Sequence, residues 1–153
     1  MTIFSGKSLF LFTFLFAICS NAHAQKPGWS AGALLGSPTG LSAKFADKSD
    51  LGFHTGLALT SGKNAQTQMF FGIEQHNDKW IDLRNDPLTA FYGVGAKLIS
   101  GSGVSLGIRG SAGLQMQVPD LPMLVYIELA PVFYLVPATT IGFDAGVGIH
   151  YQF

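Results

Sequence analysis

The sequence predicts an all-β protein, an eight-stranded antiparallel up-and-down transmembrane β-barrel that forms after signal-peptide removal. Three observations predict this fold class. Residues 141–153 alternate between apolar side chains and polar or small ones, earlier segments repeat the pattern, and segment 1–24 has the layout of a secretory signal. A period of two residues is typical of an extended strand. Bacterial outer-membrane barrels consist of an even number of such strands.

Segment 1–24 is the expected signal peptide. It carries Lys7, then the apolar run 9–18, then the small-residue sequence Ala-His-Ala at 22–24. This charged, apolar and small-residue order is typical of secretory signals. The apolar run is too short to span a bilayer as a helix. We therefore expect export, cleavage after the last alanine, and one barrel domain over 25–153.

The composition excludes several classes of protein. Charged residues make up only 12 % of the chain, and nine Lys and Arg balance nine Asp and Glu. No basic stripe is present, so a nucleic-acid partner is not expected. The one cysteine, Cys19, lies in the signal segment and follows Ile18 instead of the small residue that lipoprotein signals prefer. The mature chain then has no disulfide and no thiolate metal site.

The first four strands are expected near 28–36, 40–46, 51–60 and 67–76. Turn-forming residues separate them: Ser-Pro-Thr-Gly at 37–40, Asp-Lys-Ser-Asp at 47–50 and Ser-Gly-Lys-Asn at 61–64. The second strand is short, whereas a membrane strand needs roughly 9–11 residues. Apolar residues occupy alternate positions of the second to fourth strands: Leu41, Ala43 and Phe45; Leu51, Phe53, Leu57 and Leu59; Met69, Phe71 and Ile73.

The last four strands are expected near 88–99, 104–118, 123–135 and 141–153. Gly-Ser-Gly, Pro-Asp-Leu-Pro and Pro-Ala-Thr-Thr separate them. Each strand again has one apolar face, which is where a barrel would meet lipid. Those faces hold Tyr92, Val94, Ala96 and Leu98; Val104, Leu106, Ile108, Ala112, Leu114, Met116 and Val118; Val125, Ile127, Leu129, Pro131, Phe133 and Leu135; Ile141, Phe143, Ala145, Val147, Ile149, Tyr151 and Phe153.

Every charged residue within these strands falls on the opposite face, which would line the lumen. We expect a polar network there, with a structural role, of Lys44, His54, Glu74, His76, Lys97, Arg109, Glu128, Asp144 and His150. Three positive and three negative groups balance, and buried charges are tolerated only when paired. Side chains just fill an eight-stranded barrel. The prediction is a filled lumen without an open pore, with Arg109 and Glu128 as a direct pair. The other interpretation of these residues is a proton or ion path.

Two further functions are weighed against this one. A secreted soluble β-barrel that binds a small apolar ligand would bury the apolar face, but its exposed surface would normally carry more charge. A lipid A-modifying enzyme needs a nucleophile, a base and an acid close together. Glu74 and His76 share a face, but no serine partner is evident and no histidine spacing suits a metal. We therefore expect no catalytic, cofactor-binding or metal-binding residue.

Three blocks resemble a family of small bacterial outer-membrane proteins, including spirochaete members, that has no settled function. The blocks are 36–45 with its Pro-Thr-Gly-Leu sequence, 91–98, and 127–131 with its Glu-x-Ala-Pro sequence. The chain departs from the family pattern at three positions. The family has tyrosine in place of Phe45, arginine in place of Lys97, and often arginine in place of His150. In architecture it is similar to OmpA-like and OmpX-like barrels. The resemblance implies an outer-membrane barrel, and it implies no activity.

The closing strand and the loops suggest the partners. Tyr151 and Phe153 form the expected carboxyl-terminal assembly motif, which the barrel-assembly machinery would bind, and outer-membrane lipids would surround the wall. With the amino terminus in the periplasm, the outward loops would be 37–40, 61–66, 101–103 and 136–140, which are short. The longest connection, 77–87, would face the periplasm. The sequence specifies no protein partner and no cofactor.

Overall fold

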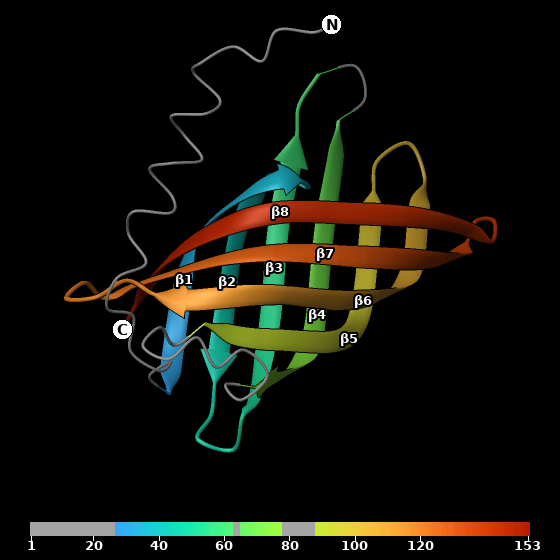
Figure 1. Cartoon of the computed structure of the whole chain (residues 1–153). Helices are drawn as coiled ribbons and strands as arrows, with labels where there is room; N and C mark the ends of the chain where they lie inside the picture. Colours follow the sequence, from blue (N-terminus) through green and yellow to red (C-terminus); the bar gives the residue numbers. More distant parts are fainter. Residues whose placement is uncertain (1–26, 63–64, 78–87) are drawn as a thin grey trace, which may run out of the picture.

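The computed structural model describes residues 27–62, 65–77 and 88–153, and it shows a closed barrel (Figure 1). Each strand pairs antiparallel with its neighbours in sequence, and the last strand pairs with the first. The predicted eight-stranded antiparallel barrel is confirmed, and every predicted strand boundary lies within one residue of the observed one. The strands are β1 (Gly28–Ser37), β2 (Gly40–Ala46), β3 (Leu51–Thr60), β4 (Gln66–Asn77), β5 (Thr89–Ser100), β6 (Val104–Gln117), β7 (Met123–Val136) and β8 (Thr140–Gln152).

Two of the sequence predictions fall on other parts of the chain. The expected signal peptide at 1–24 and positions 78–87 of the long connection lie outside the described residues. Within the described part, no helix is long and apolar enough to cross a membrane.

The strands are strongly inclined to the barrel axis. Following the paired residues from Gly28 around the barrel leads to Asp144, and the β8–β1 register sets Asp144 opposite position 38. The difference, 38 − 28, is a stagger of ten residues, which for eight strands corresponds to a tilt of about 40°. Figure 1 agrees, because the nearer strands β5–β8 cross the farther strands β1–β4.

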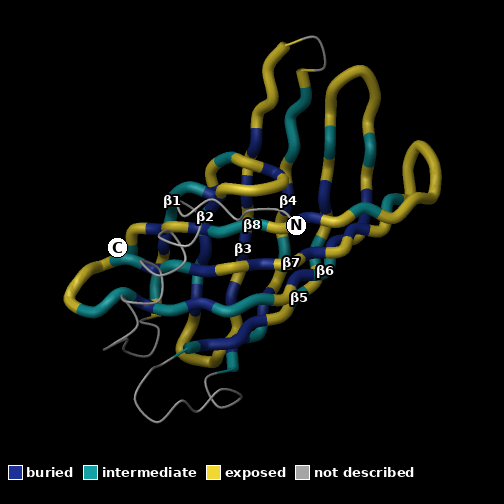
Figure 2. Tube along the Cα trace, turned by 45° about the horizontal axis from the view of Figure 1, so that its top comes forward, coloured by how far each residue is buried: buried dark blue, intermediate teal, exposed yellow. Residues whose placement is uncertain are grey.

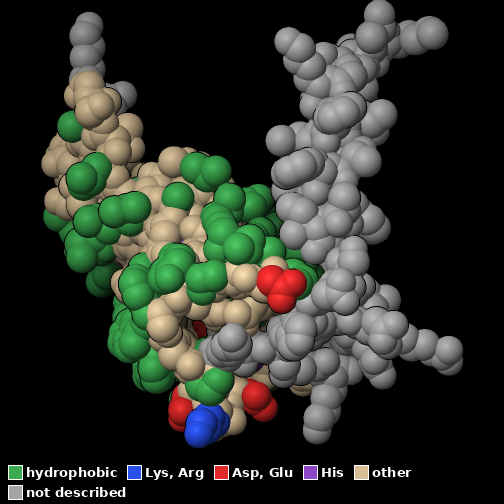
Figure 3. Space-filling model, turned by 90° about the vertical axis from the view of Figure 1, so that its left-hand side faces the viewer, with side chains coloured by type: hydrophobic (Ala, Val, Ile, Leu, Met, Phe, Trp, Pro, Cys, Tyr) green, Lys and Arg blue, Asp and Glu red, His purple; other side chains and the backbone are tan. Residues whose placement is uncertain are grey.

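The barrel wall carries its apolar side chains outside and its polar side chains inside. Burial alternates along the strands (Figure 2). Trp29, Phe71, Leu129 and Phe143 are each more than half exposed on the outer wall. In Figure 3, hydrophobic side chains are spread over much of the visible described surface. The apolar faces predicted from the period of two are therefore the outer faces of the barrel.

Charged residues avoid the wall entirely in the part of the chain that the structure describes. Six of them point into the barrel. The others lie at the end of the barrel where β1 and β3 begin, namely Asp47, Lys48, Asp50 and Asp120. The opposite end, with the turns after β1, β3, β5 and β7, has no charged side chain among its described residues.

Glycines on the inner face make room for aromatic rings. A Cβ atom on Gly148 would lie 2.0 Å from the ring of Tyr126, and one on Gly56 would lie 2.3 Å from the ring of Phe70. These rings fill the lumen over the neighbouring strand, because glycine has no side chain to compete for the space. The apolar cluster inside the barrel consists of Leu34, Phe70, Phe91 and Tyr126.

The β6–β7 ladder contains a register shift that the sequence did not predict. Leu106 pairs with Val136, whereas the next residue, Gly107, pairs with Tyr134. One extra residue, Leu135, is therefore accommodated in β7, as in a β-bulge. Leu135 and Val136 are both exposed, so the strict alternation of faces ends at this point.

Candidate functional site

The structure places all nine residues of the expected lumen network inside the barrel, and all are at least nine-tenths buried. They come from seven of the eight strands, β2 to β8. Alternation fixes this arrangement, because each residue sits at an inward position of its strand. This lumen network is the candidate functional site.

The first part of the network joins Lys97, Asp144, Arg109 and Glu128. Lys97 Nζ donates to both Asp144 carboxylate oxygens, at 2.6 and 2.8 Å. Arg109 Nε donates to Asp144 Oδ2 at 3.2 Å, and Arg109 Nη2 donates to Glu128 Oε1. The Arg109 guanidinium also lies 4.2 Å from the centre of the Phe70 ring. The ion pair expected between Arg109 and Glu128 is therefore present, and Asp144 extends it to Lys97.

The second part of the network has His54 between two carboxylates. Its Nδ1 lies 2.9 Å from Glu74 Oε1 and 3.1 Å from Glu128 Oε2. Lys44 Nζ lies 2.9 Å from Glu74 Oε2 and donates to Gln115 Oε1 at 3.1 Å. The same ammonium group is 3.6 Å from the centre of an aromatic ring, that of Phe91. Through His54, the Lys44 and Arg109 ion pairs belong to one continuous network.

A chain of neutral groups extends the network from His54. Because carboxylates only accept, His54 Nδ1 carries a hydrogen, and its Nε2 lies 3.2 Å from the Tyr126 hydroxyl. Tyr126 contacts Ser42 at 2.8 Å, and Ser42 contacts His150 Nε2 at 2.7 Å. His150 Nδ1 lies 3.2 Å from Ser30 Oγ. When His54 and His150 are both neutral, each hydrogen-bond donor in this series has an acceptor. The hydrogen bonds then all point toward His54.

The charges inside the barrel balance. Lys44, Lys97 and Arg109 face the three carboxylates of Glu74, Glu128 and Asp144. Removing an ion from water costs several kcal/mol, and only close pairing offsets this cost. Removing one partner of such a buried pair typically costs about 3–5 kcal/mol, because the other charge stays buried. The stability of the fold is therefore expected to depend on each of the six charged members of the network.

His76 is the member of the predicted set with the fewest contacts. Its Nε2 lies 3.7 Å from Glu74 Oε2, and its ring centre lies 6.2 Å from that of Phe91. Neither ring nitrogen has a hydrogen-bond partner among the described residues, although the side chain is buried. The expected proximity of Glu74 and His76 is real, but the pair lies inside the barrel.

His54, Glu74 and Glu128 also have the donor types of a metal site. One ligand atom from each lies within 4.8 Å of the others. However, Lys44 and Arg109 already compensate the two carboxylates. A divalent cation added there would leave two uncompensated positive charges in a buried site, which is costly. The charge balance therefore favours an ion-pair network over a metal centre.

Ser42 and His150 have a contact that resembles a nucleophile and its base. A hydrolytic triad also needs an acidic group on the second ring nitrogen, and here that nitrogen faces Ser30. Ser42 and His150 are both buried inside the barrel. These polar groups behave as a satisfied hydrogen-bond chain within a packed lumen.

The predicted network of nine residues leaves out several residues that complete it. The parity of the strands alone carries a signal for them, because most lie an even number of residues from a charged inward position of the same strand. They are Ser30, Ser42, Gln115, Tyr126 and the two ring residues Phe70 and Phe91. Their apolar or neutral character concealed them in a search for charged groups.

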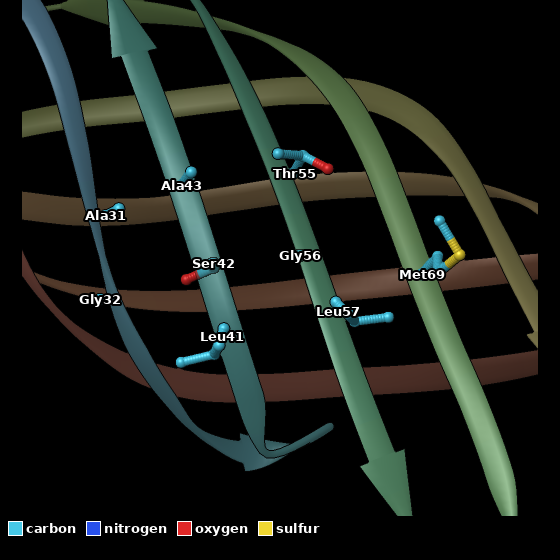
Figure 4. Close-up of a pocket in the computed structure, with 9 residues that line it drawn as sticks. All are labelled: Ala31, Gly32, Leu41, Ser42, Ala43, Thr55, Gly56, Leu57 and Met69. Carbon is cyan, nitrogen blue, oxygen red and sulfur yellow. The ribbon is translucent and has the colours of Figure 1, made fainter.

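The outer wall has shallow hollows lined by small side chains. Ala31, Ala43 and Thr55 lie side by side on β1, β2 and β3, next to the larger Leu41 and Leu57 (Figure 4). A comparable hollow crosses β6, β7 and β8 at Ala112, Leu129 and Ala145. Both hollows are apolar and face away from the lumen network.

Aromatic rings form a row on the outer wall where β1 begins. Trp29, Phe45, Phe53 and Phe71 follow one another, with ring centres 5.0, 6.3 and 6.0 Å apart. The two residues of the expected assembly motif, Tyr151 and Phe153, are exposed, and their ring centres lie 5.4 Å apart. Aromatic residues at the end of an apolar wall are typical of a membrane interface.

Comparison of the chain with family models, with curated proteins and with solved structures gave no match.

Proposed function

We propose that the protein is an integral β-barrel of the bacterial outer membrane, exported by a cleaved signal peptide, with a structural or interaction role. One observation carries this proposal. The barrel is inverted relative to a water-soluble domain, because large apolar side chains cover its wall and the charged residues of its strands are inside. Water would disfavour such a wall, whereas lipid favours it.

The dimensions of the wall support the same proposal. Seven of the strands have 10 to 14 residues, and β2 has seven. At about 3.3 Å per residue and a tilt of about 40°, strands of 10 to 14 residues rise roughly 25–35 Å. An outer-membrane barrel needs an apolar band of about 25 Å. The closed ladder of paired strands also satisfies most backbone groups of the wall, which a bilayer cannot do.

The interior supports a structural or interaction role over transport and catalysis. Arg109, Glu128 and the rings of Phe70 and Tyr126 fill the middle of the lumen. A lipid A-modifying enzyme would need its Glu74 and His76 on the lipid side, but both point inward. A carrier of small apolar ligands would need an apolar cavity, and this lumen contains an ion-pair network.

The test of this proposal is fractionation of cells that express the full chain, followed by gel electrophoresis with and without boiling. We expect the protein in the outer-membrane fraction, extractable only with detergent, and an unboiled band that migrates faster than the boiled one. A chain that is released without detergent and shows no mobility shift would contradict the proposal. Mass spectra of lipid A, unchanged on overexpression, would support the non-catalytic role.

A further inference from the structure

The β1–β2 hairpin is shorter than the hairpins on either side of it, and this leaves a notch in the rim of the barrel. The last residue of β1, Ser37, pairs with Ala145, but β8 continues five residues further, to Thr140. On the other side, the β2–β3 register ends at Leu57, and β3 continues to Thr60. In Figure 1, β8 runs on past the end of β1.

The register identifies the backbone groups that β8 presents at this notch. The carbonyl oxygens of Ala145 and Ile149 face β1, where they lie against its glycines. Backbone groups of a strand alternate sides with a period of two. The N–H and C=O groups of Ile141 and Phe143 therefore face the same way, beyond the end of β1. Among the described residues, no strand pairs with β8 on that side at 140–144.

The side chains along this edge are unusual for an exposed strand. Ile141 and Phe143 are 80 % and 63 % exposed, and Gly142 lies between them. Natural proteins protect edge strands with charges, prolines or bulges. Here the nearest charge, Asp144, is turned inward onto Lys97. Apart from this inward Asp144, the edge 140–144 has no charge, no proline and no bulge, and an uncovered edge is not tolerated in the hydrocarbon of a bilayer.

We propose that the β8 edge 140–144 is the docking site for an extended, uncharged segment of another protein, which adds to the barrel antiparallel to β8. The added strand would continue the β1–β8 ladder in register, with apolar side chains on the outer face beside Ile141 and Phe143. From β8 to β3 the gap spans three strand spacings, or about 14 Å, which leaves room for a strand or a hairpin.

A second copy of the chain is not the partner that this geometry favours. Two β8 edges pair antiparallel only when one barrel is inverted relative to the other. Copies inserted into one membrane in the same direction cannot meet in this way. This exclusion of a second copy depends on the proposed membrane location, whereas the free edge itself belongs to the barrel fold.

The test measures amide hydrogen exchange by NMR on the folded barrel in detergent micelles. The probe is a capped peptide of alternating threonine and valine. We expect it to slow exchange at Ile141 and Phe143 in a saturable way. At nine-tenths occupancy the slowing is about tenfold, because only the free fraction exchanges. The same peptide with alternate amides methylated should have no effect. Folding is established first by the gel-mobility shift, so the result is readable wherever the protein is located.

Two variants separate backbone pairing from side-chain contact. Phe143→Pro removes the amide that faces the notch, at a position where an edge strand tolerates proline, and it should abolish the slowing at Ile141. Phe143→Ala keeps this amide, so the peptide should still slow exchange at Ile141. Equal slowing with the methylated peptide, or no slowing at saturation, would overturn the proposal. The amides of Ile141 and Phe143 could also exchange slowly without peptide, and more slowly as the protein concentration rises. That result would assign the edge to a second copy and overturn the proposal.

Discussion

At the scale of single residues, this protein depends on pairing among side chains that are buried inside the barrel. Arg109 contacts two carboxylates and an aromatic ring, so it joins Asp144 to Glu128, which His54 in turn links to the second part of the network. Arginine suits this position because its planar group donates in several directions. The fold also requires glycine at several inward positions, because aromatic rings occupy the space that a side chain would take there. Both conditions give predictions for single substitutions.

Replacing Arg109 should destabilise the barrel strongly. Arg109→Leu leaves Glu128 without its cation, so we expect a loss of about 3–5 kcal/mol in the free energy of unfolding. The double variant Arg109→Leu/Glu128→Leu should lose less than the sum of the single variants, with a coupling of about 1–3 kcal/mol. Urea unfolding in lipid vesicles measures each value. Lys48→Leu, at an exposed position in the β2–β3 turn, is the control, and strictly additive losses would contradict the ion pair.

Alanine at Gly148 should be far more costly than alanine at Gly103. The added Cβ of Gly148→Ala would lie 2.0 Å from the Tyr126 ring, whereas nothing lies within 4 Å of Gly103. We expect a loss of about 1–3 kcal/mol at Gly148 and a change within about 0.5 kcal/mol at Gly103. The same unfolding experiment compares them. Equal stability of the two variants would show that the ring does not occupy this space.

At the scale of the elements, each strand separates two environments. Leu129 near the middle of β7 points outward, and its neighbour Glu128 points into the network. The aromatic row on β1 to β4 lies at one end of the same wall. The environment outside the wall determines the cost of a charge there, and this cost distinguishes lipid from water.

An arginine on the middle of the wall therefore tests the membrane location. In lipid, Leu129→Arg should cost about 2–4 kcal/mol, and Leu59→Arg near the end of β3 should cost about 0–1 kcal/mol. Both leucines are more than half exposed, so in water neither change should exceed about 0.5 kcal/mol. Refolding and unfolding in vesicles gives the difference. A cost that does not depend on depth would argue against a membrane-spanning wall.

At the scale of the whole molecule, closure and filling determine what can pass through the barrel. Eight strands enclose a space that side chains occupy. Lys44, His54 and Arg109, with their carboxylate partners, lie across the middle of it. The proposed membrane location assigns the wall to lipid and leaves the two rims to other partners.

The filled lumen predicts a lack of conductance. In planar bilayers the natural chain should give no stable current steps, because the ion pairs block the path. The double variant Arg109→Ala/Glu128→Ala removes both large side chains at the centre and should give steps or raised leakage, provided that it still folds by the gel-mobility test. Stable ohmic steps from the natural chain would contradict the filled interior and favour a channel.

Much of this architecture was predictable from the sequence because the period of two is a local property. The alternation in segments such as 104–118 placed Arg109 inward and Ile108 outward, and turn residues located the strand ends. The balance of three cations and three carboxylates also followed from composition and parity. The register shift beside Leu106 was not predictable, because no local signal distinguishes the extra residue in β7.

The order of apolar and polar residues along the chain is enough to specify the number of strands, their faces and the charge of the lumen. The stagger around the barrel, and with it the choice of which inward residues meet, is a property of the closed structure alone. The contacts of His54 with Glu128, and of Ser42 with Tyr126, join strands distant in sequence. Such contacts depend on closure of the barrel, because the register of all eight strands together sets the position of each residue along the barrel axis.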